Sequence, residues 1–169
     1  MSDLMSAGAA AGDERPRREF LTCRLGVETY GIDILKVQEI RELERVTRVP
    51  HVSPFVRGVI NLRGAIVPVV DLGLMFGFPR PLGLEDASAI VLNVERRMVG
   101  LVVDGVSDVV ALADDEIGPA PDLGERAVGR ALQGIGTRAD APGGGGEGEE
   151  SILLLDVDHL MRRIREERA

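Results

Sequence analysis

The chain has 169 residues, about the length of one domain, and 44% of them are hydrophobic, a fraction typical of a globular core that needs no disulfide or metal ion. Aromatic residues make up only 3% and the formal net charge is −8, so base stacking and attraction to phosphate backbones or anionic lipids are both disfavoured. The single cysteine, Cys23, excludes an intrachain disulfide and a multi-cysteine metal site, and its apolar neighbours predict a buried thiol.

Residues 1–18 are small, charged and unpatterned, which predicts a disordered N-terminal tail. They lack the basic and apolar segments of a signal peptide, and no stretch of the chain reaches the ~18 apolar residues of a membrane span. We therefore expect a cytoplasmic protein without direct membrane insertion. Order is expected to begin near Phe20, with strands at Phe20–Leu25 and Tyr30–Asp33.

Asp33 can cap a helix, which the periodicity predicts over Ile34–Leu43. Such a helix carries two apolar stripes where one would suffice to hold the core. Either the second stripe remains available to a partner, or the helix is wedged between two subdomains and buried on both sides. The stripes consist of Ile34, Val37 and Ile40 and, nearly opposite, of Leu35 and Leu43.

A hairpin follows, with strands at Val59–Leu62 and Ala65–Val70 around a tight Arg63-Gly64 turn. Because Pro68 cannot donate a ladder hydrogen bond, its strand should have an edge or a bulge there. Asp71 can then cap a short helical turn that reaches Phe76. The remaining expected strands are Ser88–Val94, Met98–Asp104, Ser107–Leu112, Arg130–Gly136 and Ser151–Asp156.

Two features complete the chain. The glycine- and glutamate-rich segment 138–150 is expected to be a flexible insertion, and residues 158–169 to form a C-terminal helix capped by Asp158. Many short strands separated by Gly and Pro turns favour small β-barrels or a sandwich. Two strand-rich halves of similar length suggest two small barrels that share a core.

The sequence carries no convincing catalytic or metal-binding constellation. Its two histidines, His51 and His159, lie outside any metal-ligand or nucleophile spacing. The acidic run 114–116 lacks the spacing of a calcium loop and is better interpreted as a capped turn. We therefore expect no enzyme, no cofactor and no metal, and apolar strands without catalytic groups are typical of an interaction module.

Three long blocks occur in order along the chain: YGIDILKVQEIR at Tyr30–Arg41, GVINLRGAIVPVVDL at Gly58–Leu72 and VGLVVDGVSDV at Val99–Val109. They closely resemble the motifs of the CheW family of bacterial chemotaxis coupling proteins, and the resemblance covers residues 19–160. It implies a mainly β fold of two five-stranded, SH3-like barrel subdomains packed together, with a short helix after strand 2 and a C-terminal helix. We place the barrel halves at about 19–84 and 85–157.

The resemblance implies a non-enzymatic adaptor that links the helical hairpin at the cytoplasmic tip of a chemoreceptor to the regulatory domain of the histidine kinase CheA. The receptor hairpin would dock in an apolar groove between the barrels, a helix-in-groove mode of binding. The matching receptor positions are Leu21, Ile34, Val37, Ile40 and Val106, with the polar residues Glu39 and Arg63 nearby. Arg63 at a hairpin tip suits a charge-assisted contact, although it can also be a solvated turn residue.

Other family positions carry further expectations. Val46, Phe55 and Arg57 are the candidate kinase contacts, and core packing is the alternative role for Val46 and Phe55. Gly58 and Gly64 are expected to serve structural turns. A ring-closing contact, with the CheW-like regulatory domain of CheA or with another copy of the chain in array rings, would use the loop represented by Gly118, Asp122 and Leu123. The sequence departs from the enteric type there, since Gly118 replaces a larger basic residue and Leu123 an aromatic one.

Two alternative functions stay open. The same fold could serve a non-flagellar chemosensory pathway, such as surface motility or development. An enzyme or small-ligand barrel would require clustered titratable groups in a pocket, and the sequence shows none.

Overall fold

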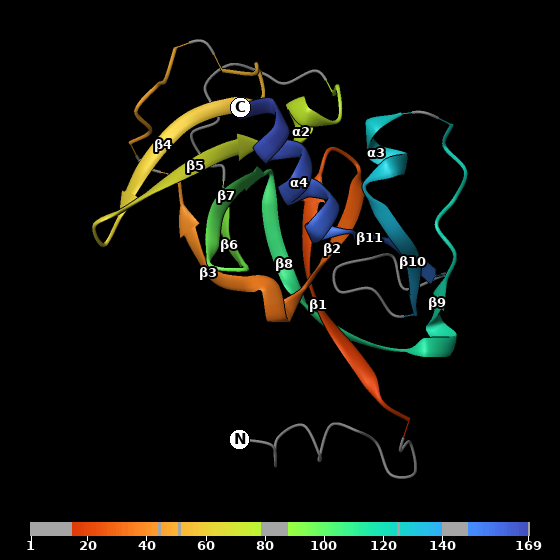
Figure 1. The fold of residues 1–169 in the computed structure, drawn as a ribbon. Coiled ribbons are helices and arrows are strands. Elements are labelled where there is room, and N and C mark those ends of the chain that lie inside the picture. The colour runs from red at the N-terminus through yellow and green to blue at the C-terminus, as the bar shows by residue number, and fades with distance from the viewer. Residues whose placement is uncertain are drawn as a thin grey trace.

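The computed structural model describes residues 15–43, 45–50, 52–78, 88–124, 126–139 and 149–168. Over these residues the chain is mainly β, with two sheets packed against each other and short helices at their margins (Figure 1). Among the described residues, no helix is long and apolar enough to cross a membrane.

Four of the first five strands were expected from the sequence, and the third is the additional one. The five strands are β1 (Arg17–Leu25), β2 (Glu28–Asp33), β3 (Val37–Glu42), β4 (Val56–Leu62) and β5 (Ala65–Asp71), followed by the short helix α2 (Leu72–Met75). Strand β1 starts at Arg17, so ordered backbone begins earlier than expected and includes the last two residues assigned to the N-terminal tail, Arg17 and Arg18.

The predicted helix over Ile34–Leu43 is wrong. Only η1 (Ile34–Lys36) is helical, as a single 3-10 turn, and Val37–Glu42 forms strand β3. The expected cap is confirmed for this shorter element, because the Asp33 side chain accepts a hydrogen bond from the Leu35 amide at 3.0 Å. Pairing of β3 with β6 supplies the long-range hydrogen bonds that local helical periodicity could not reveal.

The hairpin of β4 and β5 is confirmed, with Arg63 (φ 51°) and Gly64 (φ 89°) in its two-residue turn. Strand β5 lies inside its sheet rather than at an edge, but its pairing with β7 covers only Val69–Asp71. Pro68 therefore lies just outside the stretch that needs amide donors on that side.

The later strands follow the sequence prediction closely, except that the short strand β9 (Ile117–Gly118) was not predicted. They are β6 (Ser88–Val94), β7 (Arg97–Val103), β8 (Gly105–Ala113), β9 (Ile117–Gly118), β10 (Leu132–Ala139) and β11 (Glu149–Leu155). The acidic run forms a 3-10 turn, η2 (Asp114–Glu116), as expected of a capped turn. The short helix α3 (Ala127–Arg130) replaces the first residue of the strand predicted to begin at Arg130.

The C-terminal helix α4 (Val157–Arg168) is confirmed, but Asp158 does not cap it. Asp156 does, since its carboxylate accepts from the His159 amide at 3.0 Å. Of the predicted insertion 138–150, Arg138 and Glu150 belong to paired strands β10 and β11, and residues 140–148 lie outside the described residues, as does His51.

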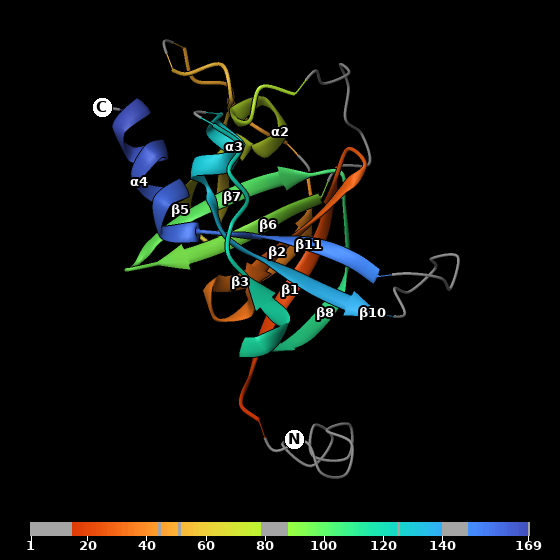
Figure 2. The ribbon, with the colours of Figure 1, turned by 90° about the vertical axis from the view of Figure 1, so that its right-hand side faces the viewer.

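The two sheets do not correspond to the two consecutive halves, 19–84 and 85–157. One sheet has the order β8-β1-β2-β11-β10-β9 and the other β3-β6-β7-β5-β4, so each draws strands from both halves. Figure 2 shows β10 and β11 crossing the molecule beside β1 and β2, while β6 and β7 lie with β5. The chain is therefore interlaced rather than divided, which ties the two sheets into one folding unit.

An isolated bridge at Thr47, beyond the end of β3, closes the five-stranded sheet. Thr47 pairs with Val59 of β4 through two backbone hydrogen bonds, each 2.8 Å long. Strands β3 and β4 are the two outer strands of this sheet, and the bridge links the chain that follows β3 to β4, so the sheet curls into a barrel.

The main core lies between the sheets. Alternate residues of β1, β6 and β7 point into this core. The residues between them point to the opposite face of their own sheet, where smaller clusters form. The cluster on the six-stranded sheet consists of Phe20, Val110, Leu112, Ile152 and Leu154. The cluster on the five-stranded sheet includes Leu62, Val67 and Val91. Burial on both faces explains the near-continuous apolar runs of these strands.

Candidate functional site

Apolar side chains that reach the surface gather where η1 passes from one sheet to the other. Ile34 and Val37 are half-buried and pack on the core between the sheets, as does Val106 of β8. Leu21 of β1 is buried beneath them. Because η1 packs against both β1 and β6, these four residues occupy the junction between the two sheets. We call Leu21, Ile34, Val37, Val106 and Val109 the apolar strip.

Val109 is the member that the sequence analysis missed. It is 47% exposed, and it lies directly opposite Leu21 in the β1–β8 ladder. In the same ladder Val106 lies opposite Cys23, so Val106 and Val109 share the face on which Leu21 and Cys23 lie. The end of the third family block, at Val109, was the only signal in the sequence that could have drawn attention to it.

Ile40 is 48% exposed and lies on β3. The helical face that would have placed it with Ile34 and Val37 does not exist, so the argument from a second apolar stripe fails. A register shift between Val37 and Glu39 in the β3–β6 ladder separates Ile40 further from the regular alternation. Ile40 is therefore not assigned to the strip.

Glu39 and Arg63 form an ion pair on the outside of the five-stranded barrel. The Arg63 side chain is largely exposed at the hairpin turn, and Glu39 is half-buried on β3. The pair brings together the two polar residues that the family resemblance placed near the receptor. It leaves guanidinium donors free to face a partner, because one carboxylate cannot use all five.

Gly58 and Gly64 serve different purposes in the backbone. Gly64 follows the hairpin tip with open space where a Cβ would lie, and its amide donates to Asn61 Oδ1 at 2.9 Å. Gly58 has φ of 145°, and a Cβ there would lie 2.1 Å from the Thr47 carbonyl oxygen. Only glycine therefore permits the Thr47 bridge that closes the barrel.

The three candidate kinase residues differ in accessibility. Phe55 is buried at 6% exposure, with the Arg163 guanidinium of α4 stacked 5.6 Å from its ring centre. Val46 is half-buried against Val69 and Val102. Arg57 Nη1 lies 3.5 Å from Oδ2 of the fully buried Asp71, whose Oδ1 accepts from the Leu74 amide. Of these three residues, Val46 and Arg57 are therefore the ones whose side chains are partly accessible at the surface.

The ring-contact candidates lie around β9 and the segment after it. Gly118 ends β9 and is half-buried, opposite Ile135 of β10. Asp122 is exposed and accepts a hydrogen bond from the Gly124 amide at 3.0 Å. Leu123 packs on the main core and touches the position where Gly129 would carry a Cβ. Leu123 is thus partly withdrawn from the surface.

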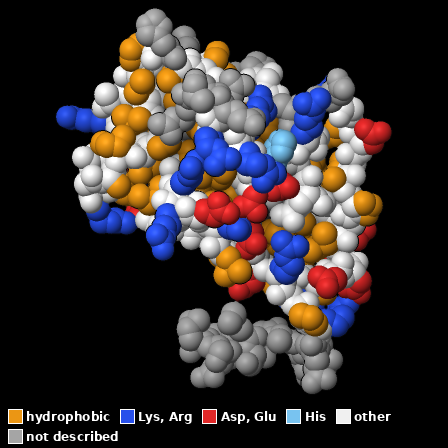
Figure 3. Space-filling model, in the orientation of Figure 1, with side chains coloured by type: hydrophobic (Ala, Val, Ile, Leu, Met, Phe, Trp, Pro, Cys, Tyr) orange, Lys and Arg blue, Asp and Glu red, His pale blue; other side chains and the backbone are white. Residues whose placement is uncertain are grey.

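The one cysteine of the chain, Cys23, lies on the same face of β1 as Leu21. Burial, aided by the charge of Asp104, raises the pKa of the Cys23 thiol to about 12, so it stays protonated at neutral pH. Among the described residues, no three acidic, histidine or cysteine side chains could hold a metal ion. Figure 3 shows hydrophobic side chains interspersed with basic and acidic ones on one face, with basic groups gathered near its centre.

Comparisons with known proteins agree with this architecture. The family model for the CheW-like domain matches residues 19–165. The chain is 42% identical to Chemotaxis protein CheW of Klebsiella aerogenes over 95% of its own length and 91% of that protein, and 29% identical to Protein FrzA of Myxococcus xanthus over 94% of each. It superposes on the crystal structure of the scaffolding protein TtCheW from Thermoanaerobacter tengcongensis with a TM-score of 0.70 and 27% identity, covering 83% of this chain and 90% of that one. The chain therefore belongs to the CheW family.

Proposed function

We propose that the chain is a chemotaxis adaptor that couples the cytoplasmic tips of chemoreceptors to the histidine kinase CheA. Membership of the CheW family supports a scaffolding role in chemotaxis. The observation that carries the receptor contact is the apolar strip, in which Leu21 is buried and the other four aliphatic side chains are partly exposed at the junction of the two sheets. A protein of this kind works in the cytoplasm and is recruited to membrane-associated receptor arrays through its partners.

The strip suits an α-helical partner. A helix presents apolar residues at three- and four-residue intervals along one side, and a strip of aliphatic side chains can bury that side. The strip's residues are aliphatic, consistent with the 3% aromatic content, so shape and hydrophobic burial would supply the affinity. Beside the strip, Glu39 and Arg63 supply the polar contacts that orient the partner.

Binding of the purified chain to a receptor signalling fragment tests this proposal. Val37→Asp would place a charge in the apolar contact, and we expect affinity for the fragment to fall at least tenfold (about 1.4 kcal/mol or more). Val27→Asp is the matched control, because Val27 is 97% exposed in the β1–β2 turn and outside the strip. Equal affinities for a folded Val37→Asp variant and for its control would refute the strip as the receptor site.

The kinase contact is proposed for the surface around Val46 and Arg57. A pocket of about 510 Å³ opens nearby between β3 and β4, lined in part by Arg41, Arg45 and Thr47. Its position next to Val46 gives a protein partner a concave, partly charged surface on the five-stranded barrel. Phe55 would contribute indirectly, by holding α4 through Arg163. The CheA regulatory domain should bind the wild-type chain, and Val46→Lys should weaken that binding while receptor binding persists.

Two further parts of the proposal concern assembly and pathway. A ring-closing contact with the CheA regulatory domain would use Gly118, Asp122 and Leu123, of which Asp122 is the most accessible. The similarity to Protein FrzA keeps a second chemosensory circuit as an alternative. Pull-down against the receptors and kinases encoded beside this chain distinguishes the circuits, and capture of neither partner would refute the adaptor function.

A further inference from the structure

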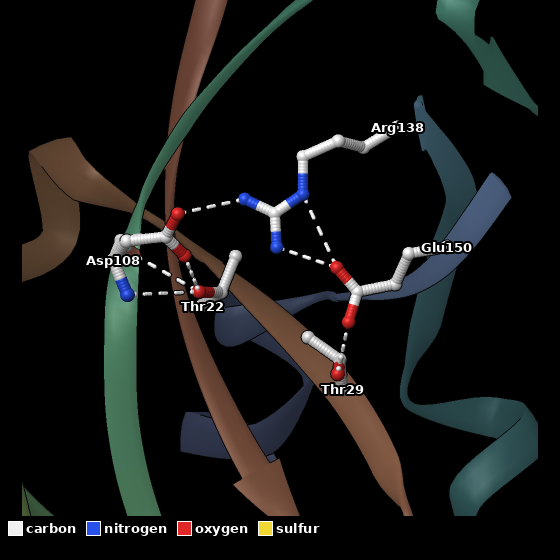
Figure 4. Close-up of polar contacts among 5 residues, drawn as sticks. All are labelled: Thr22, Thr29, Asp108, Arg138 and Glu150. Atoms are coloured by element: carbon white, nitrogen blue, oxygen red, sulfur yellow. Dashed lines mark hydrogen bonds and ion pairs between the residues drawn. The ribbon is translucent and has the colours of Figure 1, made fainter. Parts of the chain in front are cut away.

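A layer of polar side chains lies on the same face of the six-stranded sheet as the apolar cluster that contains Phe20, Val110 and Ile152. Three polar residues each lie two positions along their strand from a member of this cluster, and so point to the same face of the sheet: Asp108, Glu150 and Thr22. Figure 4 shows how the layer's five side chains converge, one from each of five strands. They are Thr22 (β1), Thr29 (β2), Asp108 (β8), Arg138 (β10) and Glu150 (β11).

Arg138 is the centre of this layer, with a side chain that is only 13% exposed. Its Nη1 lies 2.8 Å from Asp108 Oδ2, and its Nε lies 3.1 Å from Glu150 Oε1. Glu150 Oε2 in turn accepts from the Thr29 hydroxyl at 2.9 Å. Burial acts to lower the pKa of Arg138, but the hydrogen bonds and charges of Glu150 and Asp108 raise it, so the guanidinium stays charged.

The contact between Arg138 and Asp108 joins two strands that are not neighbours in the sheet. In the order β8-β1-β2-β11-β10-β9, strand β8 is at one end of the sheet and β10 is next to the strand at the other end. The sheet curves so that β10 comes close to β8. Among the described residues, no backbone ladder joins β8 to β10. The side-chain ion pair therefore spans the place where the ladder is open, and it holds Asp108 from the side opposite β1.

Strand β8 contains a bulge at the residue that Arg138 holds. Leu21 pairs with Val109 and Cys23 with Val106, so Ser107 and Asp108 together lie opposite the single residue Thr22. In a regular strand Val106 and Val109, three positions apart, would point to opposite faces. The extra residue puts both on the face of the apolar strip.

Thr22 and Asp108 fasten the bulge to β1. The Asp108 amide donates to Thr22 Oγ1 at 3.1 Å, and the Thr22 hydroxyl lies 2.5 Å from Asp108 Oδ1 and 3.0 Å from its carbonyl oxygen. Thr22 is fully buried, so water cannot substitute for these contacts. Asp108 thus has one carboxylate oxygen beside Thr22 and the other on Arg138.

We infer that Arg138 is a positioning residue for partner docking: by clamping Asp108 it keeps the β8 bulge, and the bulge keeps Val106 and Val109 side by side on the apolar strip. The inference rests on the proposed function for the statement that the strip binds a partner. Without the clamp the bulge can slip by one residue, and such a slip turns one of the two valines to the other face of β8.

Three full-length variants test the clamp. Arg138→Met removes the guanidinium and keeps an unbranched side chain, whereas Arg97→Met removes the same charge from an exposed site on β7. Thr22→Val removes the hydroxyl without changing the net charge or the side-chain shape. The first measurement is NMR without any partner: hydrogen exchange of the Asp108 amide, and the nuclear Overhauser contact between the Leu21 and Val109 methyl groups.

We expect Arg138→Met and Thr22→Val to accelerate exchange of the Asp108 amide about tenfold or more and to weaken the Leu21–Val109 contact. Amides of β6 and β7, in the other sheet, should exchange as in the wild type. Arg97→Met should change none of these signals. An unaltered Asp108 amide and methyl contact in a folded Arg138→Met would overturn the inference, because Thr22→Val tests only the attachment of the bulge to β1. If Arg138→Met does not fold, Arg138→Gln takes its place in both measurements.

The second measurement is affinity for a receptor signalling fragment. Arg138→Met and Thr22→Val should each bind about tenfold more weakly than the wild type, and Arg97→Met should bind normally. Equal losses in Arg138→Met and Arg97→Met, with normal binding by Thr22→Val, would mean that charge rather than position matters and would overturn the positioning role. If the wild type binds no fragment although the NMR changes occur as expected, the bulge clamp stands and the proposed receptor function fails.

Discussion

Replacing Gly58 with alanine should open the five-stranded barrel. Gly58 has φ of 145°, and a Cβ at this position would lie 2.1 Å from the Thr47 carbonyl oxygen and 2.7 Å from its carbonyl carbon. Both neighbours are backbone atoms, so no side-chain rotation relieves the overlap. The Thr47–Val59 bridge must separate or β4 must move away from it.

The size of the effect follows from the contacts that are lost. Two backbone hydrogen bonds join Thr47 to Val59, and each contributes about 1 kcal/mol net to stability. Holding a non-glycine residue in this backbone region adds about 1–3 kcal/mol of strain. The total is about 3–5 kcal/mol in the free energy of unfolding, or a fall in Tm of roughly 6–20 °C for a domain of this size.

Urea unfolding, with hydrogen exchange at the Thr47 and Val59 amides, measures this effect. Gly26→Ala is the matched control, since Gly26 also has positive φ, at 67°, but has no atom within 4 Å of its Cβ position. It should cost only about 1–2 kcal/mol, from backbone strain. Equal losses of stability in the two variants would refute the role assigned to the bridge, because strain alone would then account for both.

Four other predictions concern single side chains. Arg57→Met should lower the free energy of unfolding by about 2–4 kcal/mol, because it removes the guanidinium beside the buried Asp71 carboxylate; a loss under about 0.5 kcal/mol in urea would show that the pair is not stabilising. Arg63→Gln should change stability by less than about 1 kcal/mol, since its ion pair is exposed, yet weaken receptor binding measured by calorimetry; unchanged binding would remove Arg63 from the docking surface. Cys23 should react with a thiol reagent at pH 8 only after unfolding. Because burial raises the pKa of Cys23 and of Tyr30 to about 12, stability should fall as pH rises from about 9 towards 12, and a flat profile over that window would contradict this.

The strands were predictable because their apolar residues are continuous and their turns are marked by glycine. Strand β6 spans the predicted Ser88–Val94, and the Arg63-Gly64 turn lies where the sequence placed it. The order of strands within the sheets was not predictable from these local signals. The parallel pairs β5–β7 and β2–β11 join segments far apart in the chain, and the local sequence of a strand does not indicate which other strand it pairs with.

The segment 34–42 shows how a local pattern can mislead. Its apolar residues fit a helical period, but β-branched residues at Val37 and Ile40 also suit a strand, and pairing with β6 decides between them. The family positions Ile34 and Val37 still lie on the junction between the sheets. Their position at this junction follows from the pairing of β3 with β6, and the helical periodicity that grouped them in the sequence does not apply.

The bulge in β8 illustrates the opposite case, in which a pattern conceals a surface. Read as a regular strand, Val106 and Val109 belong to opposite faces, so no alternation rule groups them. The grouping depends on Thr22, Asp108 and Arg138, three polar residues drawn from three strands. Since Arg138 looked like the start of a flexible insertion, its part in shaping an apolar surface could emerge only from three-dimensional contacts. The proposed partner-binding surface would thus depend on the polar side chains behind it as well as on the aliphatic side chains that face outward.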